Sequence, residues 1–134
     1  MKYSDYVSKK RISFVASGFD VDPGAVNPMM SGRYQYQADI TRWNLRRGKA
    51  ANFLDCGLGK SPLEGEFAHH VHEHTSAPVL VVAPLGVSMQ LHREFSKFGY
   101  ISKIVRDQSG IIDGINITNY EKLSKFDPAM FGGL

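Results

Sequence analysis

Apolar side chains recur at helical spacing in three parts of the chain. Each stretch repeats an apolar residue about every fourth position, and a glycine directly follows the first and the last stretch, as is usual after a helix end. The spacing predicts helices over residues 35–47, 60–74 and 86–98. Trp43 lies on the stripe of the first helix and is expected in the core. A mixed pattern over residues 3–14 is a candidate for a short helix.

Short continuous apolar runs lie between and after these helices. Runs of β-branched and aliphatic residues are typical of strands buried on both faces of a parallel sheet. Such a run predicts a strand over residues 78–84, and the shorter, mostly apolar stretches predict strands over residues 49–55, 100–105 and 114–118. The alternation of strand and helix indicates an α/β fold, a three-layer arrangement with a parallel sheet and flanking helices.

Composition places the chain among ordinary globular proteins. It has 134 residues, of which 43% are hydrophobic and 22% charged, and this suits one domain. We expect a lead-in segment over residues 1–33, rich in turn residues, and the α/β domain over 34–134. No apolar run is long enough to cross a membrane and the N-terminus lacks the apolar core of a signal peptide, so a cytoplasmic protein is expected.

The stretch "DCGLGKS" carries the clearest chemistry. The phosphate-loop pattern is G-x-x-x-x-G-K-[ST], in which backbone amides and lysine hold phosphates and the hydroxyl holds magnesium. Gly59, Lys60 and Ser61 match its end, whereas Leu54 occupies the slot of its first glycine. A predicted strand precedes the stretch and a predicted helix follows it, which favours a nucleotide site over a simple glycine turn.

Four stretches together resemble one family. "DCGLGKS" resembles motif I of superfamily 2 helicases and Swi/Snf-type translocases, and "YQYQADITRW" resembles their Q motif. "VLVVAPLGVSMQLHREFSKF" resembles motif Ia, and "INITNYEKL" resembles the segment near motif Ib. The likeness covers about residues 30–131 and is closest to helicase-like phage proteins. It implies a RecA-like P-loop NTPase domain that is incomplete.

The resemblance also implies site residues, with ATP and Mg²⁺ as cofactors. Lys60 would be catalytic and contact the β/γ phosphates, Ser61 would bind Mg²⁺, and Gln37 would read the adenine edge. The nucleotide site as a whole would comprise Tyr36, Gln37, Cys56, Gly57, Leu58, Gly59, Lys60 and Ser61. The nucleic-acid side, for DNA rather than RNA, would comprise Pro84, Leu85, Gly86, Gln90, Thr118 and Asn119. Asn119 is also expected to cap the helix after it.

The sequence departs from the family at its C-terminal end, "FDPAMFGGL", where motif II would be expected next. The D-E box of motif II, motif III and the second RecA-like domain are absent from it. Phosphoryl transfer depends on such charged groups, so the chain is expected to bind ATP but to be inactive alone. We expect it to be the N-terminal part of a longer helicase, with the remainder of that protein as partner, in the host cytoplasm if phage-encoded. The missing strands would leave a gap in the sheet and unpaired strand edges.

Other interpretations stay open at this point. A truncated chain could serve as a non-catalytic nucleotide-binding or interaction module. A P-loop kinase or GTPase-like switch is a further class, although the Q-motif-like stretch has no role there. The run "HHVHEH" at residues 69–74 suggests a metal site, because His70 and His74 are one helical turn apart.

Overall fold

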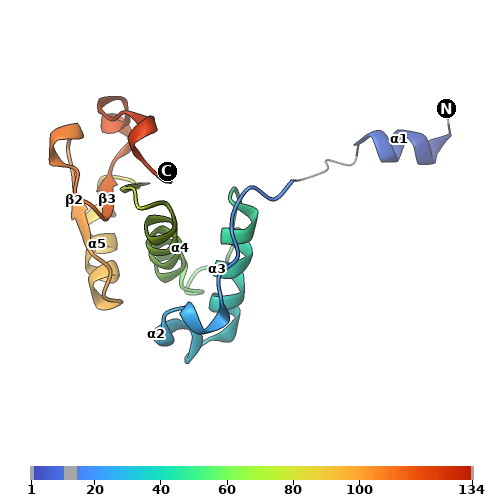
Figure 1. Ribbon diagram of the computed structural model, residues 1–134, viewed down its shortest axis with the longest axis horizontal. Coiled ribbons are helices and arrows are strands. Elements are labelled where there is room, and N and C mark those ends of the chain that lie inside the picture. The colour runs from blue at the N-terminus through green and yellow to red at the C-terminus, as the bar shows by residue number, and fades with distance from the viewer. Residues whose placement is uncertain (1, 11–14, 134) are drawn as a thin grey trace.

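The computed structural model describes residues 2–10 and 15–133, and this part of the chain is a mixed α/β fold. Figure 1 shows the small sheet and α5 on one side, α4 in the middle and α3 beyond α4. The α-helices are α1 (Tyr3–Lys10), α2 (Pro28–Ser31), α3 (Gln35–Arg47), α4 (Lys60–Thr75) and α5 (Ser88–Lys97). The strands are β1 (Val79–Val82), β2 (Ser102–Ile104) and β3 (Ile115–Thr118). Short 3-10 turns are η1 (Pro23–Ala25), η2 (Gln108–Gly110), η3 (Tyr120–Lys125) and η4 (Pro128–Met130).

The strands form one parallel sheet in the order β1, β3, β2. Val79 of β1 and Ser102 of β2 both pair with Ile115, so the strand that is last in sequence lies in the centre. Every residue of β3 is buried, as expected for a strand covered on both faces. The strands predicted over residues 78–84, 100–105 and 114–118 are confirmed, each a little shorter than predicted.

The three predicted helices are confirmed as α3, α4 and α5. Gly48 and Gly99 follow α3 and α5 with φ angles of 76° and 82°, a left-handed conformation that costs glycine little. The candidate helix over residues 3–14 is confirmed over α1, and its last positions, 11–14, lie outside the described residues. None of the helices in the described ranges combines the length and the apolar character that crossing a membrane requires.

The two faces of the sheet are covered differently. Val79 and Val81 belong to the main core, to which α3, α4 and α5 all contribute side chains. Leu80 lies on the opposite face with Val105 and Phe126. In the described part of the chain, turns and loops rather than α-helices cover this second face, so the predicted third layer is not helical.

The prediction of a strand over residues 49–55 is wrong. This segment has no regular secondary structure, and Phe53 is 97% exposed. A strand needs a neighbour for its backbone N–H and C=O groups. A cavity of about 820 Å³, lined by this segment and by Gly133 next to β1, takes the place of such a neighbour.

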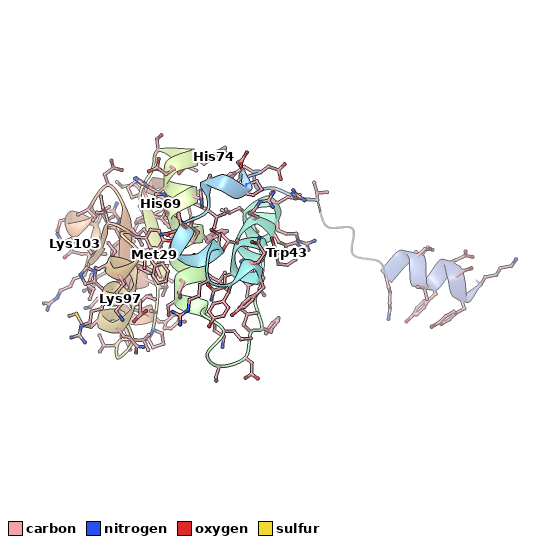
Figure 2. All side chains as sticks on the ribbon, turned by 90° about the horizontal axis from the view of Figure 1, so that it is seen from below. Met29, Trp43, His69, His74, Lys97 and Lys103 are labelled. Atoms are coloured by element: carbon pink, nitrogen blue, oxygen red, sulfur yellow. The ribbon has the colours of Figure 1, made fainter. Side chains whose placement is uncertain are left out.

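Trp43 also differs from expectation. The residue lies on α3, but it is 47% exposed and Figure 2 shows it on the outer side of the molecule. Its ring contacts the Arg47 guanidinium, with 5.2 Å between guanidinium carbon and ring centroid. The buried face of α3 carries Leu45 and Ala38 instead, which are 1% and 2% exposed.

The segment expected as a lead-in has two differently packed parts. Val26 and Met30 are 2% and 0% exposed, so residues near η1 and α2 are part of the packed body. The helix α1 buries none of its residues, and Figure 1 shows it away from the rest of the molecule.

Candidate nucleotide-binding site

The glycine-rich turn at residues 56–59 leads directly into the N-terminus of α4. Gly57 and Gly59 have φ angles of 79° and 80°, in the left-handed region. Gly59 is the N-cap of α4, and among the described residues no cap side chain bonds to the first amides of the helix. Free amides and the helix dipole create positive potential at this point, which favours a bound anion.

Two side chains of α3 hold this turn from the side. The Tyr36 hydroxyl and the Gln37 side-chain amide both donate to the Leu58 carbonyl oxygen, over 3.1 and 3.3 Å. Gln37 is 7% exposed, and a Cβ at Gly59 would lie 2.2 Å from its Nε2. A side chain at Gly59 would therefore force the Gln37 amide to move, in addition to adopting an unfavourable φ angle. In this conformation Gln37 supports the turn, and its reading of adenine stays a prediction.

The reactive side chains of the turn face open space. Lys60 is exposed and Ser61 half-buried in the first turn of α4, so both can approach a ligand at the helix N-terminus. Cys56 is exposed, and its backbone N–H donates to Asp55 Oδ1 over 2.8 Å, which orients the start of the turn. A Cβ at Gly57 would meet nothing within 4 Å.

The cavity of about 820 Å³ opens beside this turn, between α4 and residues 48–54. Lys60 lines it together with Leu63, Phe67 and Val71 of the same helix. Asn44 lines it from α3, where it is 4% exposed and its Oδ1 has no hydrogen-bond partner in the described part of the chain. The lining of the cavity is thus mostly apolar, and the buried Asn44 Oδ1 lies in one of the residues that form its wall.

Glu64 is a site residue that the sequence analysis missed, as is Asn44. It lines both the large cavity and an adjoining one of about 350 Å³. Desolvation by surrounding atoms raises the pKa of its carboxyl group. Glu64 follows Lys60 by four residues on a predicted helix. Because residues four apart share a helix face, this spacing could have identified Glu64 as a neighbour of Lys60 from the sequence.

The residues predicted to contact nucleic acid lie at the carboxyl ends of β1 and β3. The Ala83 N–H donates to the Thr118 carbonyl over 2.9 Å, so these two strand ends are neighbours. Most of the predicted contact residues are exposed, namely Pro84, Leu85, Gly86 and, on α5, Gln90. Residues 76–78 join α4 to β1, so the two run in opposite directions and the glycine-rich turn before α4 lies toward the same end of the sheet.

Thr118 and Asn119 are placed differently from the other four. They are 2% and 4% exposed, so neither side chain reaches the surface. Asn119 Oδ1 accepts from the Lys122 N–H over 3.2 Å and so caps η3, which confirms the predicted capping role. The Thr118 hydroxyl is buried and has no hydrogen-bond partner among the described residues.

A buried carboxylate anchors the helix that carries Lys60. Glu66 is 1% exposed, and its Oε1 accepts from the Asn27 N–H over 3.0 Å and is 2.8 Å from His70 Nε2. Its Oε2 accepts from the Tyr100 hydroxyl. Burial by itself raises the pKa of Glu66. The hydrogen bonds from His70, Tyr100 and Asn27 together lower the pKa by more than burial raises it, so the net pKa is below the ordinary value. Burial and the bond to Glu66 raise the pKa of Tyr100.

The histidines of α4 bind other groups rather than a shared centre. His70 bonds Glu66, His72 bonds the Ala77 carbonyl over 2.9 Å, and His74 stacks on Phe19 with 3.8 Å between ring centroids. Figure 2 shows His69 and His74 apart from each other along the helix. The described residues contain no group of three or more side chains placed to hold a metal ion.

Comparison with known proteins assigns no family to the chain. No protein-family model matches it. Neither the curated proteins nor the solved structures include a significant match to it. A functional assignment therefore has to come from the residues and geometry of the site.

Proposed function

We propose that the chain is the ATP-binding part of a RecA-like P-loop domain, of the kind found in superfamily 2 helicases and translocases. The proposal is carried by the turn into α4, where two left-handed glycines precede a helix N-terminus without a side-chain cap among the described residues. Lys60 and Ser61 occupy the first helical positions. The P-loop pattern puts its phosphate-binding lysine and magnesium-binding hydroxyl there.

The residues of the turn fit a magnesium–nucleotide ligand. Backbone amides of residues 57–59 and the Lys60 ammonium would hold phosphate oxygens, and the Ser61 hydroxyl would be a ligand to Mg²⁺. Bound ATP would supply the phosphoryl group, and Mg²⁺ would offset its charge. Tyr36 and Gln37 would contact the adenine after exchanging their bonds to Leu58.

The resemblance to helicase motifs Ia and Ib suggests that the neighbouring strand ends contact nucleic acid. Pro84, Leu85, Gly86 and Gln90 are exposed at the end of the sheet toward which the phosphate turn points. DNA is the proposed partner, and the parent protein would couple ATP hydrolysis in the cytoplasm to movement along it. The buried Thr118 and Asn119 would support this surface rather than touch the nucleic acid.

A second candidate is a nucleotide-binding module without catalysis. It is favoured by residues 119–134, which contain no adjacent Asp-Glu pair of the motif II kind. Hydrolysis requires acidic groups that position Mg²⁺ and the attacking water. We therefore expect this chain by itself to bind ATP without measurable turnover.

The test is a titration of a fluorescent ATP analogue with Mg²⁺ into the 134-residue chain. Lys60→Ala should weaken binding by about tenfold or more, because it removes the charge that meets the phosphates. The matched control is Lys103→Ala, an exposed lysine on β2, which should leave the affinity unchanged. Gln37→Ala should weaken binding and reduce the preference for adenine over guanine nucleotides.

Two results would overturn the proposal. One is a folded wild-type chain that does not bind the analogue. The other is equal loss in Lys60→Ala and Lys103→Ala, which would mean that binding reflects general positive charge rather than the turn.

A further inference from the structure

We infer that the outer face of α3, together with α1, binds single-stranded nucleic acid at a site separate from the strand ends proposed above. The centre of this face is Trp43, the one tryptophan of the chain, which is 47% exposed. The Arg47 guanidinium lies over the Trp43 ring, with 5.2 Å between guanidinium carbon and ring centroid. Exposed aromatic rings with cations beside them are the groups on which the bases of a single strand stack.

The chain around Trp43 is strongly basic. Residues 42–49 contain four basic side chains and no acidic one, namely Arg42, Arg46, Arg47 and Lys49. The Arg46 side chain is 62% exposed and pairs with Asp20, whose side chain is 76% exposed. An ion pair between two exposed side chains contributes little to stability. A phosphate group can therefore take the place of Asp20 beside Arg46 at small cost.

The backbone at the end of α3 reinforces this positive character. The last carbonyls of a helix normally give its C-terminus a negative potential, which repels anions. Here the backbone N–H groups of residues 17–19 donate to the carbonyls of residues 45–47, over distances between 2.9 and 3.2 Å. Because these carbonyls already have donors, the basic side chains of the same face are opposed less by the helix dipole.

The helix α1 repeats the combination of aromatic ring and cation. Tyr3 and Tyr6 are 82% and 49% exposed, and α1 buries none of its residues. The Lys10 ammonium lies over the Tyr6 ring, 4.6 Å from its centroid. Lys10 precedes Ser17, which bonds the Arg47 carbonyl, by seven residues, a length of chain that spans at most about 25 Å. The rings and charges of α1 can thus reach the same nucleic-acid strand as Trp43.

Exposed rings among basic side chains favour a single strand over other polyanions. A single strand presents phosphates together with bases whose faces are open, and every base can stack on an aromatic ring. A duplex hides the faces of its bases within the helical stack. An acidic polypeptide would pair with the basic side chains but would bring no planar base to Trp43. The occupant that satisfies both the charges and the rings is therefore single-stranded nucleic acid.

The test uses Trp43 as its own reporter. Because the chain has one tryptophan, a base that stacks on Trp43 should quench the tryptophan emission of the whole chain. The full chain is titrated, without nucleotide, with an oligothymidylate of about 15 nucleotides at about 50 mM salt. Probes of equal length are a DNA duplex and polyglutamate. Oligouridylate distinguishes RNA from DNA, and saturable quenching by either oligonucleotide supports the inference.

The variants are compared by the anisotropy of a labelled oligothymidylate. Trp43→Ala should weaken binding by about tenfold, because it removes the stacking ring. Arg46→Gln should weaken binding and lower the slope of log affinity against log salt by about one. The matched control is Lys103→Ala, which should leave the affinity unchanged. Lys103 is exposed, and Figure 2 shows it on the side of the molecule opposite Trp43.

Three results would overturn the inference. The first is a folded chain whose Trp43 emission neither oligonucleotide changes. The second is equal affinity for polyglutamate or for the duplex, which would mean that charge alone is recognised. The third is binding that Trp43→Ala leaves intact, which would assign the strand to another surface, such as the strand ends of the proposed function. Because the titration contains no nucleotide, failure of ATP-analogue binding would overturn the proposed function and leave this inference standing.

Discussion

At the scale of single residues, Glu66 shows how this fold accommodates a buried charge. An isolated carboxylate in the interior would be costly, and it would become protonated instead. Here hydrogen bonds from Asn27, His70 and Tyr100 stabilise the charged form. Asn27 and Tyr100 come from other parts of the chain than α4, so this side chain ties α4 to the N-terminal segment and to the loop between α5 and β2.

Glu66→Gln should lower the free energy of unfolding near pH 7 by about 1–3 kcal/mol, because a neutral amide cannot accept all of these bonds. The folded-state pKa of Glu66 is below its ordinary value of 4.5. The stabilisation is therefore complete above that value and is lost as the pH falls through the folded-state pKa. Urea unfolding at several pH values should show a steeper acid loss for wild type than for the variant.

Glu94→Gln provides the control for this prediction. Glu94 pairs with Lys97 on the surface of α5, where an ion pair contributes less than about 1 kcal/mol. The free energy of unfolding of the Glu94→Gln variant should therefore show the same pH dependence as that of the wild type. Identical acid slopes for wild type and Glu66→Gln would contradict the assigned role of Glu66.

At the scale of elements, the contact between α3 and the glycine-rich turn at residues 56–59 shows how two helices define the candidate site. Tyr36 and Gln37 lie at the start of α3, and both donate to Leu58 in the turn before α4. Because of this close approach, a side chain at Gly59 would displace the Gln37 amide from its bond to Leu58. The turn is thus defined by a second helix as well as by its own glycines.

Gly59→Ala should destabilise the protein more than Gly57→Ala. Both positions have φ near 80°, so each alanine costs about 1–2 kcal/mol for the left-handed conformation. Only at Gly59 would the new Cβ collide with Gln37, 2.2 Å from its Nε2, which adds about 1 kcal/mol or more. Urea unfolding measures the loss of stability in each of the two variants. The difference should disappear in a Gln37→Ala background, and equal losses in the wild-type background would contradict the contact.

At the scale of the whole molecule, residues near the N-terminus complete the packing around α4. Met30 is fully buried, and its sulfur lies 3.9 Å from the Tyr100 hydroxyl. The main core joins side chains from α3, α4, α5 and the sheet, with Phe95 at 0% exposure. Residues 15–33 and the α/β body should therefore unfold as one cooperative unit.

Met30→Ala should lower the free energy of unfolding by about 2–5 kcal/mol, as large-to-small changes at buried positions do. The adjacent Met29 is 56% exposed, so Met29→Ala should change the free energy of unfolding by less than about 0.5 kcal/mol. Denaturant unfolding with fluorescence detection compares the two. An unchanged transition in Met30→Ala would mean that the N-terminal segment unfolds separately.

Local patterns were sufficient for most elements of this molecule. The helices α3, α4 and α5 follow from apolar spacing and from terminal glycines, which act within a few residues of themselves. The run of β-branched residues at β1 predicted a buried strand for the same reason. The glycine turn before Lys60 was also readable, since the left-handed φ angles of Gly57 and Gly59 are a local requirement.

What needed the tertiary structure was every feature that depends on a distant partner. Residues 49–55 have strand composition but form none, because strand pairing is non-local and a cavity lies where the neighbour would be. Helical spacing put Trp43 on the apolar stripe of α3 but could not show which side of α3 packs against the core. Asn44 and Glu64 became site residues only once α3 and α4 enclosed a cavity. The sequence by itself thus determined the local elements and the positive φ angles of the turn before Lys60, whereas packing decided which side chains meet.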